Sequence, residues 1–132
     1  MSEIVRLGIQ GVRVSTFIGW REEERRILRP LLVDVELQVE YDGSGELAGT
    51  VDLEAVLRVV QNLEGKEFRL LEDLAAQVAG GVLSLSPRVR AARVRVSKPL
   101  PPVAAHLDCE WAEVTRSRDG EGLSGAGGKR PT

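Results

Sequence analysis

The sequence has very few of the residue types that build covalent or metal sites. Its 132 residues include a single cysteine, Cys109, and a single histidine, His106. One thiol cannot form an internal disulfide, and one cysteine with one histidine falls short of the four ligands of a structural zinc site. We interpret both residues as structural, and we expect neither a metal ion nor another cofactor.

Long apolar runs and a strong net charge are also missing. No run approaches the ~20 apolar residues that span a bilayer. The formal net charge of -2 gives no reason to expect a nucleic-acid or membrane partner. The segment Met-Ser-Glu-Ile-Val-Arg at the start lacks the basic-then-apolar layout of a signal peptide. These features predict a cytoplasmic protein with one domain.

Alternation of apolar and polar residues predicts four strands. Residues 4–18 are strand-like, and their apolar set changes phase after Gly11, which predicts a β-bulge there. Residues 31–40, LLVDVELQVE, alternate cleanly, as expected of a half-buried strand. Residues 89–98, VRAARVRVSK, alternate in the same way, and residues 107–115 form the last expected strand.

Two segments between these strands have helical spacing. Apolar residues from Leu53 to Leu63 recur on one helical face, and Gly65 is a suitable stop. A second apolar stripe runs from Leu70 to Val82. After these elements the chain ends in a polar, glycine-rich stretch, so we predict a folded domain over residues 1–116 and a disordered tail over 117–132.

The order β-β-α-α-β-β predicts an α+β fold, in which a four-stranded antiparallel sheet is covered on one face by two helices. The other face would carry Glu36, Gln38, Arg93 and Arg95, and no element remains to cover it. Open sheet edges invite pairing with another chain. This favours a ring-forming homo-oligomer, and a monomer with an ordinary solvated sheet face is the alternative.

Three ionisable positions are candidates for a site, and each also has a structural explanation. The glutamates at 22–24 follow Gly19 directly, but charged triplets after a strand are commonly solvated. Glu72 lies in the first turn of the second helix, where the macrodipole alone favours a carboxylate by ~0.3–1 kcal/mol. Lys98 precedes Pro99 at a strand end, where most lysines are solvated.

Four segments together resemble the dihydroneopterin aldolase family. They are VRVSTFIGWREEER, TVDLEAV, RLLEDLAAQVA and VRVSKPLPPV, in this order and spacing, and the resemblance covers about residues 4 to 116. It implies the tunnelling fold, in which the sheets of several subunits join edge to edge into a barrel. It also implies a homo-oligomer, either an octamer of two stacked tetrameric rings or a tetramer, with sites between neighbouring subunits.

The resemblance assigns a role to each matching position. Glu72 matches the glutamate that anchors the pterin ring, and the backbone at Leu71 and Val51 would frame the ring. Lys98 matches the catalytic acid/base lysine. Glu24 matches the glutamate that holds the hydroxyls of the substrate side chain, which leaves the other two glutamates of the triplet solvated.

The implied reaction is the retro-aldol cleavage of 7,8-dihydroneopterin in folate biosynthesis. It yields 6-hydroxymethyl-7,8-dihydropterin and glycolaldehyde. The substrate's own ring accepts the electrons, so neither a metal nor a Schiff base is implied.

The chain departs from the family pattern at two positions. Leu53 occupies the place of a tyrosine that takes part in proton transfer, and a leucine can neither donate nor accept a proton. Arg29 stands where a glutamine is common. Three interpretations are therefore open: an aldolase, a 2′-epimerase of dihydroneopterin or its triphosphate, and a ring protein that binds a pterin or purine without catalysis.

Overall fold

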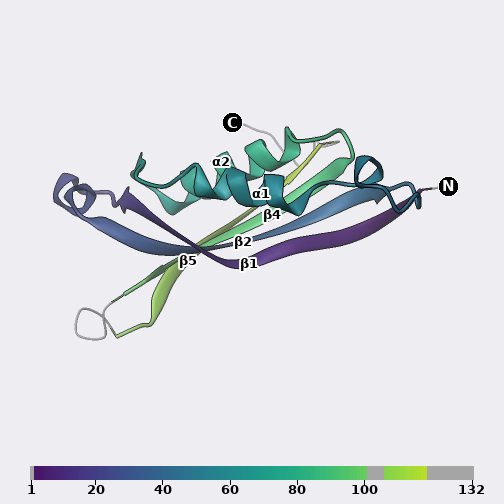
Figure 1. The fold of residues 1–132 in the computed structure, drawn as a ribbon. Helices are drawn as coiled ribbons and strands as arrows, with labels where there is room; N and C mark the ends of the chain where they lie inside the picture. Colours follow the sequence, from purple (N-terminus) through teal and green to yellow (C-terminus); the bar gives the residue numbers. More distant parts are fainter. Residues whose placement is uncertain (1, 101–105, 119–132) are drawn as a thin grey trace.

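The computed structural model describes residues 2–100 and 106–118, which form one curved sheet and two helices (Figure 1). The strands and helices, in chain order, are β1 (Glu3–Ile18), β2 (Leu28–Tyr41), α1 (Leu53–Gln61), β3 (Glu67–Phe68), α2 (Leu71–Leu83), β4 (Val89–Pro99) and β5 (Cys109–Ser117). Two short 3-10 helices, η1 (Glu22–Arg26) and η2 (Leu47–Gly49), follow the first two strands. The α+β class and the order of the long elements are as the sequence predicts.

The strand count is different from the prediction, because the sheet has five strands in the order β3-β1-β2-β4-β5. The additional strand, β3, pairs in parallel with the end of β1, with Phe17 opposite Glu67 and Ile18 opposite Phe68. A two-residue strand is too short to show alternation in the sequence. Its presence covers one end of the β1 edge that the sequence leaves open.

The predicted bulge in β1 is present at Gly11. The pairing between β1 and β2 shifts in register between Ile9 and Val12. Gly11 has a φ of 69°, and its N–H donates to Oδ1 of Asp34 at 2.7 Å. The shift brings the apolar side chains on both sides of the glycine to the same face of the sheet.

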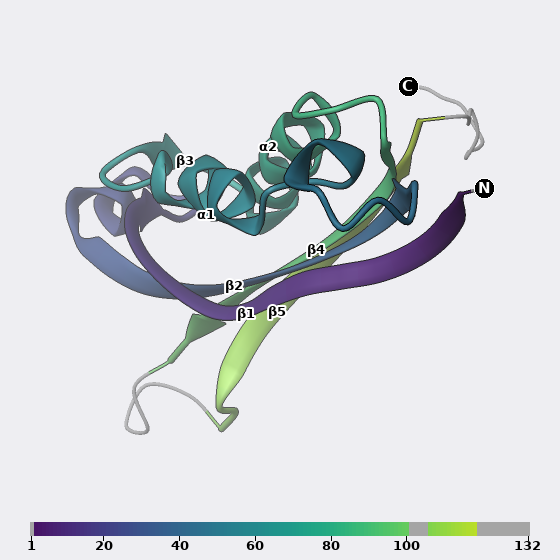
Figure 2. The ribbon, with the colours of Figure 1, turned by 45° about the vertical axis from the view of Figure 1, so that its right-hand side comes forward.

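Both helices cover one face of the sheet (Figures 1 and 2). Helix α2 packs against β4 and β5, and α1 packs against β1. The buried residues of β2 alternate along the strand, and they meet the apolar stripes of the helices in one core: Leu31, Val33, Val35, Leu37, Val39, Val56, Val60, Leu74, Val78 and Val82. The Asp52 side chain caps α1 by accepting from the N–H of Glu54 at 2.9 Å.

The opposite face of the sheet is polar, as the sequence predicts. Glu36 pairs with Arg6 and with Arg93, each at 2.9 Å. Next to them, Arg95 reaches Glu113 at 3.8 Å and stacks on the ring of Trp111 at 3.6 Å. Within the described residues, no helix lies on this face.

Strand β5 ends at Ser117, the first residue of the predicted tail. Residues 119–132, which make up most of that tail, lie outside the described residues. Neither α1 nor α2 is long and apolar enough to cross a membrane. The part of the chain that the structure describes has no group of three or more histidine, cysteine, aspartate or glutamate residues arranged to hold a metal ion.

Candidate active site

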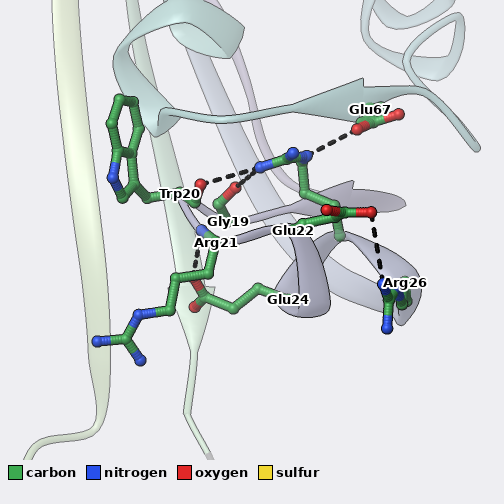
Figure 3. A network of polar contacts seen from close by, with 8 residues as sticks. Gly19, Trp20, Arg21, Glu22, Glu24, Arg26 and Glu67 are labelled. Atoms are coloured by element: carbon green, nitrogen blue, oxygen red, sulfur yellow. Dashed lines mark hydrogen bonds and ion pairs between the residues drawn. The ribbon is translucent and has the colours of Figure 1, made fainter.

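The loop after β1 is fixed to the sheet by Arg25. The Arg25 side chain is only 11% exposed, and its Nε donates to Oε2 of Glu67 in β3 at 2.7 Å. Its Nη1 donates to the carbonyls of Gly19 and Trp20, each at 3.0 Å (Figure 3). A charged group that makes three hydrogen bonds while largely buried restricts the loop strongly.

Glu24 lies inside this loop, and its carboxylate points back toward the start of the loop (Figure 3). Its Oε1 accepts from the backbone N–H of Arg21 at 3.0 Å, and its own N–H donates to the carbonyl of Arg21 at 3.1 Å. The Glu24 side chain packs on Gly19, where an added Cβ would lie 2.3 Å from the Glu24 Cβ. Of the three glutamates in the triplet, only Glu24 is partly buried.

The surroundings of Glu24 keep it ionised. The N–H of Arg21 lowers the pKa of the Glu24 carboxyl most, and the positive charges of Lys98, Arg21 and Arg29 lower this pKa further against the opposing effect of burial. A carboxylate held in this way is a strong hydrogen-bond acceptor at neutral pH.

Lys98 lies at the end of β4, on the same face as the buried residues Val94 and Val96. Its side chain is only 13% exposed, and its Nζ is 3.4 Å from Oε1 of Glu110 in β5. Lys98 is also close enough to act on Glu24 by charge. The structure therefore places two of the predicted site residues, one in the loop after β1 and one at the end of β4, close enough for their charges to interact.

Glu72 is in the first turn of α2, as predicted, and it is exposed. No hydrogen bond or ion pair from another described residue reaches its carboxylate, so both of its oxygens are available to a ligand. The helix begins just after β3, and the N–H of Gly19 donates to the carbonyl of Phe68 at 3.1 Å. Arg69 lies 6.0 Å from the ring of Trp20. The start of α2, with Leu71 and Glu72, is thus at the same end of the sheet as the Glu24 loop.

Val51 and Leu53 lie toward the other end of the sheet in the same chain. Thr50, next to Val51, lines a pocket with Val5 and Leu7 of β1, whereas Gly19 follows the last residue of that strand. At ~3.3 Å per strand residue, the part of β1 near Thr50 and the end of β1 near Gly19 are on the order of 30 Å apart. One chain therefore does not bring Val51 and Leu53 to Glu24 and Lys98.

Comparison with known proteins identifies the family. The sequence model described as dihydroneopterin aldolase matches residues 7–115. A dihydroneopterin aldolase from Streptococcus pyogenes serotype M18 is 31% identical over 117 residues, which is 86% of this chain and 98% of that protein. The chain belongs to the dihydroneopterin aldolase family.

Solved structures of dihydroneopterin aldolases share this fold. The Escherichia coli enzyme, in complex with neopterin, matches with a TM-score of 0.75 at 24% identity, over 86% of this chain and 99% of that one. A Burkholderia dihydroneopterin aldolase, bound to guanine, matches with a TM-score of 0.68 at 24% identity, over 88% of this chain and 93% of that one. These matches support the tunnelling fold expected from the sequence.

Sequence reasoning missed the residues that hold Glu24 in place. Arg25 is one of several charged residues in a row, and its partner Glu67 is distant in the sequence, so no local pattern marks the contact. The signal for Gly19 is present but weak, because a glycine after a strand is a common way to end it. Its packing against Glu24 becomes visible only in three dimensions.

Proposed function

We propose that this protein is a dihydroneopterin aldolase that cleaves 7,8-dihydroneopterin. The observation that carries the proposal is that Lys98, whose side chain is 13% exposed, lies close enough to the Glu24 carboxylate for the two charges to interact. Family membership supplies the substrate class, since the matching relatives are dihydroneopterin aldolases. The expectation of a cytoplasmic enzyme of folate biosynthesis belongs to the same proposal.

Each residue has a role that its surroundings support. Glu72 accepts two hydrogen bonds from the amino edge of the pterin ring, for which its two unengaged oxygens are suited. The backbone at Leu71 and Val51 frames the ring. Glu24, which is ionised and held rigidly, accepts from the side-chain hydroxyls of the substrate. Lys98 transfers the proton, directly or through a water molecule.

The cleavage needs one group that removes a proton from the substrate and later returns a proton to the product. The 2′-hydroxyl loses its proton, the C1′–C2′ bond breaks, and its electron pair moves into the C6=N5 imine of the ring. Glycolaldehyde leaves, and C1′ then takes up a proton to give 6-hydroxymethyl-7,8-dihydropterin. Positioned acid–base groups contribute ~10²–10⁴-fold to such a step.

The distribution of the residues supports a site shared between two copies of the chain. One end of the sheet carries Glu24, Lys98, Glu72 and Leu71. Its other end carries Val51 and Leu53. A homo-oligomer in which these two ends meet would complete the site. The proposed assembly is the octamer of two tetrameric rings, or a single tetramer.

Leu53 favours one alternative, a 2′-epimerase. Its side chain is partly buried against the core and carries no proton to give, so protonation of the cleaved pterin is slower than with a tyrosine. A slow protonation leaves time for the aldehyde to add back from the other face. A pterin- or purine-binding protein without catalysis is the remaining alternative.

A product assay with 7,8-dihydroneopterin separates the three functions. Release of glycolaldehyde supports the aldolase, whereas formation of the 2′-epimer without net cleavage supports the epimerase. Saturable binding with neither product would leave only the binding protein. If cleavage is slow, Leu53→Tyr is expected to accelerate it, and no gain would mean that residue 53 does not face the reacting atoms.

A further inference from the structure

Arg29 is a cation with a buried donor that is not satisfied. Its Nε is buried and has no hydrogen-bond partner, and the remaining described residues accept no hydrogen bond from its guanidinium group. In β2 it lies directly opposite Thr16 of β1, whose fully buried hydroxyl is also without a partner. Buried donors without acceptors are rare in native proteins, and each calls for an explanation. Because Arg29 is partly exposed, its unpartnered Nε indicates that an acceptor from outside the chain belongs here.

This pair lies next to the candidate active site. Arg29 acts on Glu24 by charge, as Lys98 and Arg21 do. Arg29 is thus one of three cations, with Arg21 and Lys98, that lie near the Glu24 carboxylate.

The missing acceptor for Arg29 is best explained as an anionic group on the substrate. A guanidinium group offers a planar fork of donors that matches two oxygens of a phosphate. In the proposed function Glu24 binds the hydroxyls of the substrate side chain, and Arg29 lies near enough to Glu24 to interact with it by charge, so a phosphate on that side chain would come within reach of Arg29. Resting on that proposed function, we infer that Arg29 makes this enzyme prefer a pterin whose side chain ends in a phosphate monoester.

The chemistry of cleavage is unchanged by the ester. With 7,8-dihydroneopterin 3′-phosphate, the same C1′–C2′ bond breaks, and the phosphate leaves on the aldehyde as glycolaldehyde phosphate. The pterin product is identical, and no further reactant is needed. Arg29 thus affects which substrate is preferred, because it binds the phosphate of the part that leaves as glycolaldehyde phosphate.

The test measures dissociation constants of wild type for 7,8-dihydroneopterin and for its 3′-phosphate. We expect the ester to bind at least about tenfold tighter to wild type. In Arg29→Gln the two constants should become equal, with binding of the unphosphorylated compound retained. Arg26→Gln is the matched control, since Arg26 is in the neighbouring loop but is 70% exposed and pairs with Glu22. This variant should keep the preference.

Several results would overturn the inference. Equal affinities in wild type, or a preference that survives Arg29→Gln, would show that Arg29 does not read a phosphate. Inorganic phosphate that binds at Arg29 without any preference for the ester would show an anion site unrelated to the substrate. Glycolaldehyde release decides the proposed function separately: rapid cleavage of the unphosphorylated compound with no ester preference would uphold the aldolase and refute the role of Arg29.

Discussion

The Glu24 side chain packs directly on the backbone of Gly19, so that a Cβ at position 19 would lie 2.3 Å from the Glu24 Cβ and 3.0 Å from its Oε1. The loop after β1 therefore needs a glycine for reasons of space. The same loop is held from its other side by Arg25, which binds the carbonyl of Gly19. Glu24 is thus held by contacts within its own loop, to the Gly19 backbone and to the N–H of Arg21.

Gly19→Ala should reduce turnover strongly because the new methyl group displaces Glu24. A shift of 1 Å in a positioned group can cost on the order of 10²-fold in rate, and we expect a fall in kcat/KM of that size. The matched control is Gly65→Ala. Gly65 also has a positive φ, 76°, but an added Cβ would meet nothing within 4 Å.

Both alanine variants carry a backbone cost of about 1–3 kcal/mol from their unusual conformation. Thermal unfolding should therefore show a lowered Tm in each, whereas only Gly19→Ala should lose activity. If the two variants lose activity equally, Glu24 is not held in place by this contact.

The dependence of stability on pH should identify Glu24. Its pKa is lowered in the folded protein, first by the N–H of Arg21 and then by the neighbouring cations. A carboxyl group of this kind stabilises the fold above its unfolded pKa, and this contribution disappears as the pH falls through the lower folded pKa. Glu24→Gln should therefore lower the Tm at pH 7, and its difference from wild type should become smaller at pH 3.

The exposed neighbour Glu23 provides the comparison for this titration. Glu23→Gln should leave the Tm unchanged at both pH values, because the carboxyl of Glu23 makes no hydrogen bond with the described residues. A difference between Glu24→Gln and wild type that is the same at pH 3 and pH 7 would rule out the charged form of Glu24 as the stabilising one.

Much of the fold is readable from the sequence, because it rests on local periodicity. The alternation in residues 31–40 predicts β2 and its buried face, and the phase change at Gly11 predicts the bulge that the register shift confirms. Strand β3 could not be predicted, since Glu67 and Phe68 become a strand only by pairing with the end of β1. That pairing depends on contacts between distant segments.

The candidate site is only partly readable in the same way. Period-two alternation in β4 already places Lys98 on the face of Val94 and Val96, where the structure has it. Nothing in the triplet at 22–24 separates Glu24 from its neighbours, because the difference arises from Gly19 and from the cations of other strands. The position of Val51 and Leu53 far from Lys98 likewise depends on the direction in which α1 crosses the sheet.

Glu72→Ala should weaken pterin binding without affecting the fold. Hydrogen bonds to a charged group are worth ~1.5–3 kcal/mol each, so the loss of two should raise the Kd by at least about a hundredfold. Because Glu72 is exposed, the Tm should change little. Asp73→Ala is the matched control: it removes a second exposed carboxylate of the same helical turn and should leave the Kd unchanged. Equal affinities in the Glu72 variant and wild type would refute the anchor.

The mass in solution should be several times the chain mass of 14.4 kDa. The two groups of proposed site residues lie at opposite ends of the sheet. An active site that includes both groups therefore needs at least two copies of the chain. Light scattering combined with size-exclusion chromatography measures this mass directly. A monomer that is fully active would contradict the shared site and would leave Val51 and Leu53 without a role in binding.

Lys98→Ala should abolish turnover while pterin binding persists. The loss of a positioned acid–base group typically costs ~10²–10⁴-fold in rate, and the ring anchor at Glu72 is untouched by the change. Glu110→Gln removes the charge that pairs with Lys98. The Glu110 side chain is 56% exposed, so this ion pair is open to solvent on the glutamate side. Exposed pairs contribute about 0–1 kcal/mol, so kcat should change by less than tenfold in this control. A Lys98→Ala enzyme with wild-type kcat would show that another group moves the proton, because a truncated lysine can neither donate nor accept one.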